Sequence, residues 1–139
     1  MHCSSHFQSK DVHPVDIIKL QPMVYHMDHR WKTRDLPSVK KYGLWLPLLY
    51  YKVTPEWWNT NYKSNKGAYD YWEIINPPVV NEDGMIWAVK IGSNRLHVLK
   101  HLLYTSVDAI CFLDSDSLVQ YHFKLKEIDV NAFKPIDNS

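Results

Sequence analysis

The 139-residue sequence contains few cysteines, few glycines and no long apolar run. Two cysteines, Cys3 and Cys111, are too few for a disulfide framework, and no apolar leader segment is visible. We therefore expect a reducing, cytoplasmic setting, in which a thiol at Cys111 within an apolar strand is unreactive. No apolar stretch approaches the roughly 20 residues of a membrane span, so we expect a soluble protein that does not bind membranes.

An excess of charge of one sign is also missing. Sixteen Lys and Arg oppose fifteen Asp and Glu, which gives a formal net charge of +1. The overall field is therefore too weak to attract nucleic acid, and any such binding needs a local basic patch. The sequence has no G-x-S-x-G, Walker or paired C-x-x-C motif, so serine hydrolysis, P-loop ATPase activity and a zinc ribbon are not supported.

Aromatic residues, in contrast, are abundant, with six Trp and nine Tyr. A chain of this length fits one domain that buries roughly two thirds of its unfolded surface. So many rings exceed what a small core usually takes. We expect some of them to line a groove or to be exposed, where they would contact a protein partner or a second copy of the chain.

The apolar pattern predicts an α/β (α+β) fold in which short helices pack on a small mixed β-sheet. Residues 1–13 are polar and unpatterned, which indicates a flexible arm, and residues 14–139 form one domain. A turn is expected at 81–84, and helices are expected over 37–43, from 54 onward and over 94–103. The expected strands are 15–20, 44–53, 71–75, 86–91, 107–113 and 121–130.

The stretch 87–113 organises the chain as strand, glycine turn, amphipathic helix and strand. Gly92, Ser93 and Asn94 suit a strand-to-helix turn, whose first backbone amides lack intrahelical acceptors. Such a turn presents hydrogen-bond donors to an anion. The helix places its apolar side chains on one face, and these are Leu96, Leu99, Leu102 and Leu103.

Arg95 lies over this apolar face in the first turn of the helix, where a lone guanidinium needs a partner. A phosphate would supply one. A carboxylate at the edge of the core, or exposure of the side chain to solvent, is equally compatible with the spacing. The most basic segment, residues 24–37, contains Arg30 and Arg34 with two histidines and one lysine, and it is either a solvated loop or one wall of a phosphate site.

These motifs resemble the ParB/sulfiredoxin-like superfamily, in particular the N-terminal domain of ParB partition proteins. Residues 92–95 match its glycine-x-x-arginine box, and residues 42–47 match its short helix ending in glycine before a strand that begins with proline. The resemblance implies a nucleotide or phosphate site at Gly92, Ser93, Asn94 and Arg95. Ser93 stands where sulfiredoxin has its reactive cysteine, so reductase activity is not expected. No ParB-like helix-turn-helix is evident, so operator binding in the ParB manner is not expected either.

Two functions of different class follow. The first is a standalone ParB-like binding domain for a nucleotide or for a nucleic-acid phosphate such as that of DNA, with Arg30 and Arg34 beside residues 92–95. The second is an enzyme on the same fold: a nucleotide hydrolase, a phosphotransferase or a metal-dependent nuclease. Its catalytic candidates are Glu73, Asp114 and Asp116, and its cofactor is a nucleoside triphosphate with Mg²⁺.

The sequence Asp114-Ser115-Asp116 follows an apolar strand and also resembles the D-x-D metal and sugar-nucleotide motif of GT-A glycosyltransferases. Asp114 and Asp116 are accordingly the metal candidates. Its alternative interpretation is a helix cap. Carboxylates converging on the Gly92 turn would favour an enzyme, whereas basic and aromatic groups there would favour a binding domain.

Overall fold

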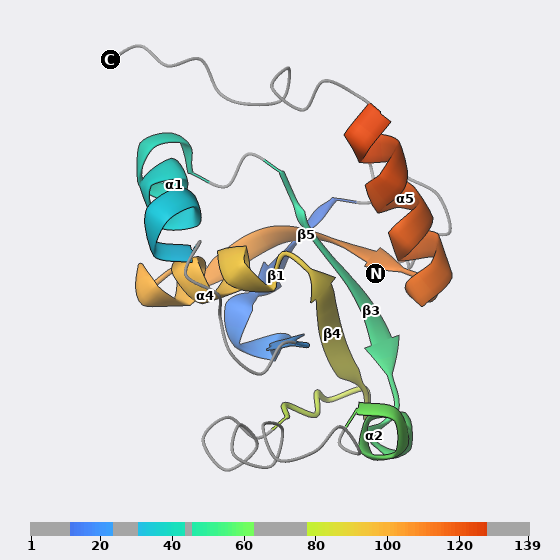
Figure 1. Cartoon of the computed structure of the whole chain (residues 1–139). Coiled ribbons are helices and arrows are strands. Elements are labelled where there is room, and N and C mark those ends of the chain that lie inside the picture. Colours follow the sequence, from blue (N-terminus) through green and yellow to red (C-terminus); the bar gives the residue numbers. More distant parts are fainter. Residues whose placement is uncertain (1–11, 24–30, 44–45, 63–77, 128–139) are drawn as a thin grey trace.

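The computed structural model describes residues 12–23, 31–43, 46–62 and 78–127 (Figure 1). Within them, five strands form one mixed sheet with helices on both of its faces, which confirms the expected α/β fold class. The expected strand at 71–75 and all but the end of the expected N-terminal arm lie outside the described residues. None of the described helices combines the length and apolar composition needed to cross a bilayer.

The strands are β1 (His13–Asp16), β2 (Leu20–Pro22), β3 (Leu48–Val53), β4 (Ile86–Ile91) and β5 (Ser106–Phe112). They lie in the order β1-β5-β3-β4-β2. β3 is central, and it runs parallel to β5 and antiparallel to β4. At the edges, β1 pairs antiparallel with β5, and β2 pairs parallel with β4.

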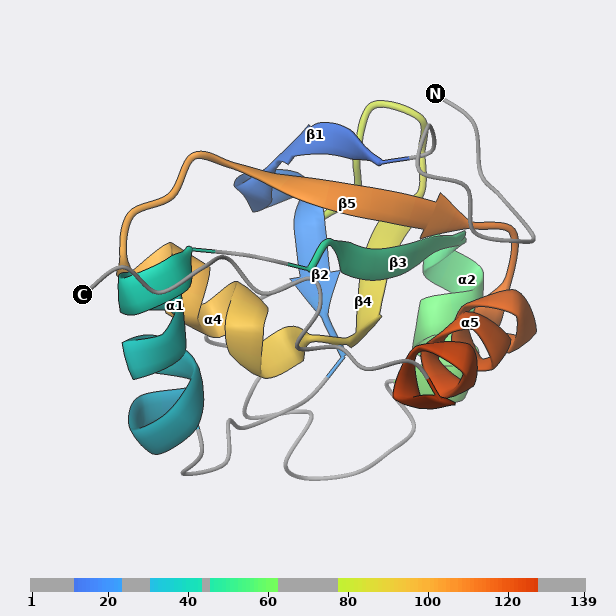
Figure 2. The same cartoon turned by 90° about the horizontal axis from the view of Figure 1, so that it is seen from above.

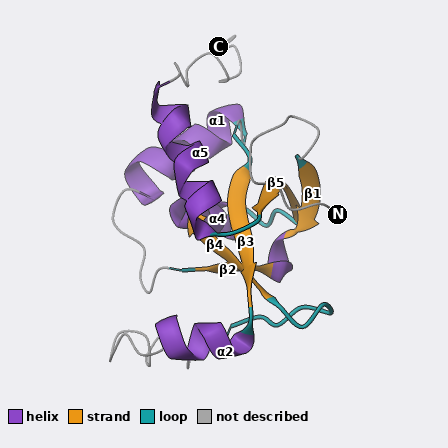
Figure 3. Ribbon diagram, turned by 90° about the vertical axis from the view of Figure 1, so that its right-hand side faces the viewer, coloured by secondary structure: helices purple, strands orange, loops and turns teal. Residues whose placement is uncertain are grey.

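The helices are α1 (Leu36–Tyr42), α2 (Pro55–Trp57), α4 (Ser93–His101) and α5 (Ser115–Glu127). A single turn of π-helix, η3 (Trp31–Asp35), precedes α1, and a second one, η4 (Trp58–Tyr62), continues α2. Figure 2 shows α1 and α4 to one side of the sheet and α5 with α2 to the other, and in Figure 3 α1 and α2 lie at opposite ends of the molecule. The fold is therefore three layers, with the sheet in the middle.

Each face of the sheet has its own hydrophobic cluster. Against α1 and α4, the buried helix residues Val39, Leu96, Val98 and Leu99 meet Leu48, Tyr50, Trp87 and Val89 of the sheet. On the other face, the buried side chains include Tyr51, Trp58, Ile110, Phe112 and Leu118. Five aromatic rings, those of Tyr50, Tyr51, Trp58, Trp87 and Phe112, are thus part of the core. The rings of Trp57, Tyr104 and Phe123 are exposed, as the composition led us to expect of some.

Several local predictions are confirmed. Gly43 ends α1 as expected, with a positive φ of 72° that favours glycine, although its ψ of −167° differs from that of the expected left-handed cap. The Thr54 hydroxyl accepts the amide of Trp57 at 3.0 Å and so begins α2. The turn at 81–84 is present, with the Gly84 amide donating to Asn81 O at 2.8 Å, although no strand is formed at 78–80 before it. β4 begins and ends where expected, and β5 does so within a residue.

Four predictions about elements are wrong. The expected strand 15–20 is interrupted by a 3-10 turn, η2 (Ile17–Lys19). β3 begins directly after Pro47, close to the strand start at a proline that residues 42–47 indicated. The alternation of side chains over residues 86–91 is typical of a strand with one face partly exposed to water, but β4 is largely buried on both faces because helices cover the sheet on both sides. The expected last strand is instead helix α5, because Asp114 Oδ1 accepts the Ser117 amide at 2.8 Å and caps it.

The fourth error concerns Leu103, which was expected to pack with the other leucines of α4. The helix ends at His101, and Leu103 takes a left-handed conformation with φ of 64°. Its side chain is 85% exposed, whereas Leu96 and Leu99 are fully buried. The apolar face of α4 is therefore shorter than the sequence pattern indicated.

Candidate functional site

The candidate site lies at the start of α4, where β4 ends at Ile91 and the chain turns at Gly92. Gly92 has φ of 100°, a conformation that residues with a Cβ rarely adopt. A Cβ there would also lie 3.0 Å from Arg95 Nη2 and 3.0 Å from Leu48 Cδ2. Glycine is thus required both by the turn and by the close approach of the arginine.

The first turn of α4 is closed by the Leu96 amide, which donates to Gly92 O at 2.9 Å. Gly92, the N-cap, has no side chain to satisfy the earlier amides. The positive end of the helix dipole adds to these donors, so the start of α4 favours a negatively charged group.

Arg95 folds back over this turn instead of extending into solvent. Its Nη1 donates to Leu46 O at 3.3 Å, and the residue is largely but not completely buried. Burial lowers the pKa of Arg95, Asp35 opposes this effect, and the charge of Arg34 lowers the pKa further. Two guanidinium groups and one carboxylate are therefore close enough to influence one another at the start of α4.

The carboxylate of Asp35 is bound by Arg34. Arg34 Nε contacts Asp35 Oδ1 at 3.0 Å and Arg34 Nη2 contacts Oδ2 at 3.1 Å, so both oxygens are held in a bidentate pair. Asp35 is buried, with 7% exposed, whereas the Arg34 side chain is 58% exposed. Among the described residues, Leu46 O is the one hydrogen-bond acceptor that the Arg95 side chain reaches. Three charged side chains thus leave one positive charge without a counterion.

Most residues predicted for the phosphate site are brought together. Gly92, Asn94 and Arg95 form the turn and first helical positions, and Ser93 is the first residue of α4. Arg34 joins them because η3 packs against α4. The carboxylate that holds Arg34, Asp35, was not among the predicted residues. Its position beside Arg34 in the sequence was the available signal. Arg30 lies outside the described residues.

The catalytic and metal candidates lie elsewhere. Asp114 and Asp116 begin α5, which packs on the opposite face of the sheet from α4, so they do not converge with Arg95. Asp114 caps α5, as the alternative interpretation of the D-x-D motif has it, and the hydrogen bond from the Ser117 amide lowers its pKa. In the part of the chain that the structure describes, no three His, Cys, Asp or Glu side chains cluster as metal ligands would. Glu73 lies outside that part.

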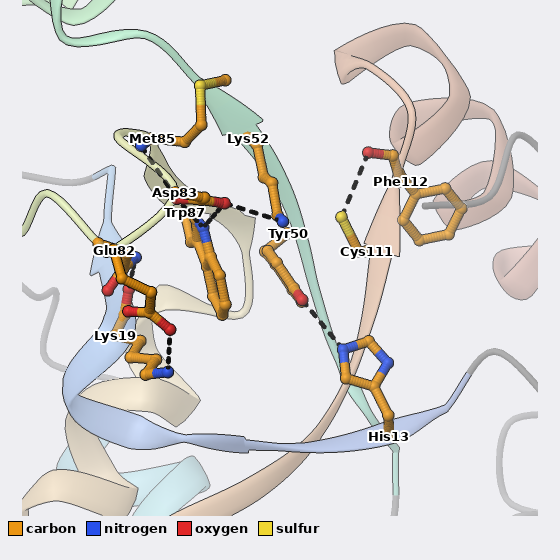
Figure 4. A network of polar contacts seen from close by, with 11 residues as sticks. His13, Lys19, Tyr50, Lys52, Glu82, Asp83, Met85, Trp87, Cys111 and Phe112 are labelled. Atoms are coloured by element: carbon orange, nitrogen blue, oxygen red, sulfur yellow. Dashed lines mark hydrogen bonds and ion pairs between the residues drawn. The ribbon is translucent and has the colours of Figure 1, made fainter. Parts of the chain in front are cut away.

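A polar network that the sequence analysis missed holds the 81–84 turn against the sheet (Figure 4). Asp83 accepts the indole N–H of Trp87 at 3.0 Å and the amide of Met85 at 3.0 Å, and it pairs with Lys52 Nζ at 3.0 Å. Burial raises the pKa of Asp83, but the hydrogen bonds from Lys52, Met85 and Trp87 outweigh it and hold the pKa below its ordinary value. The adjacent acidic residues Glu82 and Asp83 were the feature of the sequence from which this network could have been found.

Cys111 is fully buried in β5, as expected, but it is disulfide-bonded and therefore has no thiol. Cys3, the other cysteine of the chain, lies outside the described residues. Disulfides persist mainly in oxidising compartments. The cysteines consequently no longer argue for the reducing setting that their small number suggested.

Comparison of the chain with models of known protein families and with curated protein sequences found no match to either. The similarity to the ParB/sulfiredoxin-like superfamily therefore stays a prediction that depends on the residues at 42–47 and 92–95.

Proposed function

We propose that this domain binds the phosphate group of a nucleotide or a nucleic acid at the start of α4. The observation that carries the proposal is that, in the part of the chain that the structure describes, no carboxylate forms an ion pair with Arg95. Arg34 holds both oxygens of Asp35, so the one carboxylate that acts on Arg95 is already shared. A bound phosphate would supply the missing counterion and accept hydrogen bonds from the remaining guanidinium N–H groups.

The backbone supports the same ligand. Gly92 leaves the start of α4 without a capping side chain, and the helix dipole places partial positive charge there. Arg34 is more than half exposed and lies beside this turn, where it would contact a second oxygen of the same phosphate. A ParB-like relationship, if it holds, would predict a phosphate at the same four residues, 92 to 95.

We favour binding over catalysis at this site. A nucleotide hydrolase or nuclease needs a carboxylate that takes a proton or holds Mg²⁺ beside the phosphate. Asp35 is engaged by Arg34, and Asp114 and Asp116 belong to the opposite face of the sheet. An anion held by two arginines and helix amides needs no such group, so a nucleoside triphosphate would bind here with or without Mg²⁺.

The test is a titration of the chain with inorganic phosphate, with ATP in the presence and absence of Mg²⁺, and with a short DNA duplex. Thermal stability and calorimetric affinity are measured. A ligand at a hundred times its dissociation constant adds about 2.7 kcal/mol to the free energy of unfolding of the protein. The melting temperature of the protein therefore rises by several degrees.

Arg95→Ala is expected to weaken binding by about 1.5 to 3 kcal/mol, the contribution of a charge-assisted hydrogen bond. Arg95→Lys keeps the charge but not the planar fork, and so restores part of the affinity. Lys124→Ala, which removes an exposed positive charge from α5, is the matched control and leaves binding unchanged. Equal affinities for Arg95→Ala and the unaltered chain, or no binding of any of the three probes, would refute the proposal.

A further inference from the structure

A second site lies on the other side of the sheet, where β3 and β5 end and α5 begins. The structure has a pocket of about 440 Å³ there, in the size range of small-molecule sites. Its wall is largely apolar and aromatic, and one rim carries two carboxylates. Its lining includes Tyr51, Lys52, Trp57, Met85, Asp114 and Asp116.

Trp57 supplies an aromatic surface for a ligand. It follows the Thr54 cap of α2, and its ring contacts Tyr51 edge to face with ring centroids 6.4 Å apart. It is 37% exposed, whereas Trp58 and Trp87 are buried. An indole that is fixed at one edge and accessible elsewhere is suited to stacking with a ring or to contact with a cation.

The two carboxylates of the rim, those of Asp114 and Asp116, are only partly engaged in hydrogen bonds. Asp114 accepts the Ser117 amide, which lowers its pKa and compensates the positive end of α5. The carboxylate of Asp116, the next one along the rim, makes no hydrogen bond or ion pair with the described residues. It is exposed in the first turn of α5. The rim therefore retains a negative charge that can accept hydrogen bonds.

Two lysines near the pocket, Lys52 and Lys90, already have partners. Lys52 pairs with Asp83 at 3.0 Å and lies 4.6 Å from the ring centroid of Trp87. Lys90 donates to the Ser115 hydroxyl at 2.8 Å. The Lys52 ammonium is thus compensated by the Asp83 carboxylate, and among the described residues a single lysine, Lys90, opposes the two carboxylates of the rim. The charge that the described residues place at the pocket is therefore negative.

We propose that this pocket binds a small organic cation, an ammonium group carried on an aromatic body. The ammonium would donate to Asp116 and Asp114, and the ring would lie against Trp57 and Met85. This site would bind a cation, whereas the site at the start of α4 would bind an anion, and the two sites lie on opposite faces of the sheet. The inference is independent of the proposed phosphate binding.

The test compares three probes that share an indole body and differ in charge: tryptamine, the neutral alcohol tryptophol and the anion indole-3-acetate. Calorimetric titration at neutral pH is expected to rank tryptamine first and indole-3-acetate last. The double variant Asp114→Asn, Asp116→Asn removes the charge and retains an N-cap acceptor, because Asn caps helices as well as Asp does. It is expected to weaken tryptamine binding about tenfold or more, the loss that follows removal of a charged partner.

Two further variants separate this site from general effects. Asp108→Asn makes the same kind of substitution, with the loss of one carboxylate charge, at an exposed position within β5 and outside the pocket, and it leaves tryptamine binding unchanged. Arg95→Ala also leaves it unchanged, so failure at one site is distinguishable from failure at the other. Equal binding of the three probes, preference for indole-3-acetate, no binding of tryptamine, or full affinity in the double variant would each overturn the proposal.

Discussion

Arg34 binds Asp35 through both carboxylate oxygens, at 3.0 and 3.1 Å, although the two residues are neighbours in the sequence. The pair determines the electrostatics at the start of α4, because Asp35 raises and Arg34 lowers the pKa of Arg95. Arg95 is thereby left with a hydrogen bond to Leu46 O and an incompletely compensated charge. The first prediction tests this arrangement from the side of the carboxylate.

Asp35→Asn is expected to increase the affinity for phosphate, because it removes the negative charge that competes with the ligand for both arginines. A unit charge at a few ångströms in a partly buried site contributes on the order of 1 kcal/mol or more, so we expect roughly fivefold to tenfold tighter binding at low salt. The ligand-free protein loses stability, because two like charges are left together. Calorimetric titration with phosphate measures the first effect and urea unfolding the second. Weaker phosphate binding in this variant would contradict an anion site at Arg95.

Much of the fold was predictable from local signals. The strand at 86–91, the turn at Gly92 and the start of α4 follow one another closely, and each has its own sequence signature. Gly43 and Thr54 likewise mark helix boundaries through their own conformational or capping preference. At these positions the local structure depends on few contacts between residues far apart in the sequence, so it can be predicted from a single sequence.

The errors arose where contacts between residues far apart in the sequence determine the local structure. The segment after Asp116 alternates apolar and charged residues as a strand does, but burial of Leu118 and half-burial of Tyr121, three residues apart on one helix face, favour α5. The site was partly predictable for the same reason. The spacing placed Arg95 over an apolar face and required a partner, but it could not reveal that Asp35 would be held by Arg34.

The second prediction concerns Asp83, which anchors the 81–84 turn to Trp87 and Lys52. Asp83→Asn is expected to lower the free energy of unfolding by about 1 kcal/mol at pH 7, since the side chain is about one third exposed and solvent weakens its contacts. The pKa of Asp83 is depressed in the folded state, so its contribution is full above the ordinary carboxyl pKa and declines as the pH falls through the lower folded value.

Urea unfolding of the two proteins at pH 7 and at pH 3 and below checks this: the difference in stability should shrink on acidification. Glu82→Gln is the matched control from the same turn. Its carboxylate contacts Lys19 at 2.7 Å at an exposed position, so the variant should change stability little. A difference between the Asp83 variant and the unaltered chain that grows at low pH would show that the carboxylate is not held in its charged form.

The third prediction tests the packing of α4 on the sheet. Leu99→Ala is expected to cost about 2 to 5 kcal/mol, as truncation of a fully buried leucine does through lost burial and the cavity left behind. Leu113→Ala, at a position 64% exposed just after β5, is the control and should change stability by less than about 0.5 kcal/mol. Equal and small effects of the two variants in chemical unfolding would mean that α4 does not cover the sheet.

The fourth prediction concerns the end of α4, where Leu103 occupies the position that glycine usually takes. The Tyr104 amide donates to Leu99 O at 3.0 Å and the Leu103 amide donates to Lys100 O at 3.1 Å, which together form a Schellman motif. In that motif the residue at 103 is left-handed, and its φ of 64° is unfavourable for leucine by about 1 to 2 kcal/mol. The 85% exposed side chain offers little burial in return.

Leu103→Gly is therefore expected to stabilise the protein by about 0.5 to 1 kcal/mol, the relief of strain less the greater freedom of glycine in the unfolded chain. Leu103→Ala is the discriminating control, because it removes the exposed apolar atoms but keeps the Cβ that makes the left-handed conformation costly. Only the glycine variant should raise the midpoint of urea unfolding. If glycine lowers the midpoint as much as alanine does, the leucine side chain contributes contacts that outweigh the strain, and the exposed end of α4 is stabilised by packing and not by its backbone hydrogen bonds.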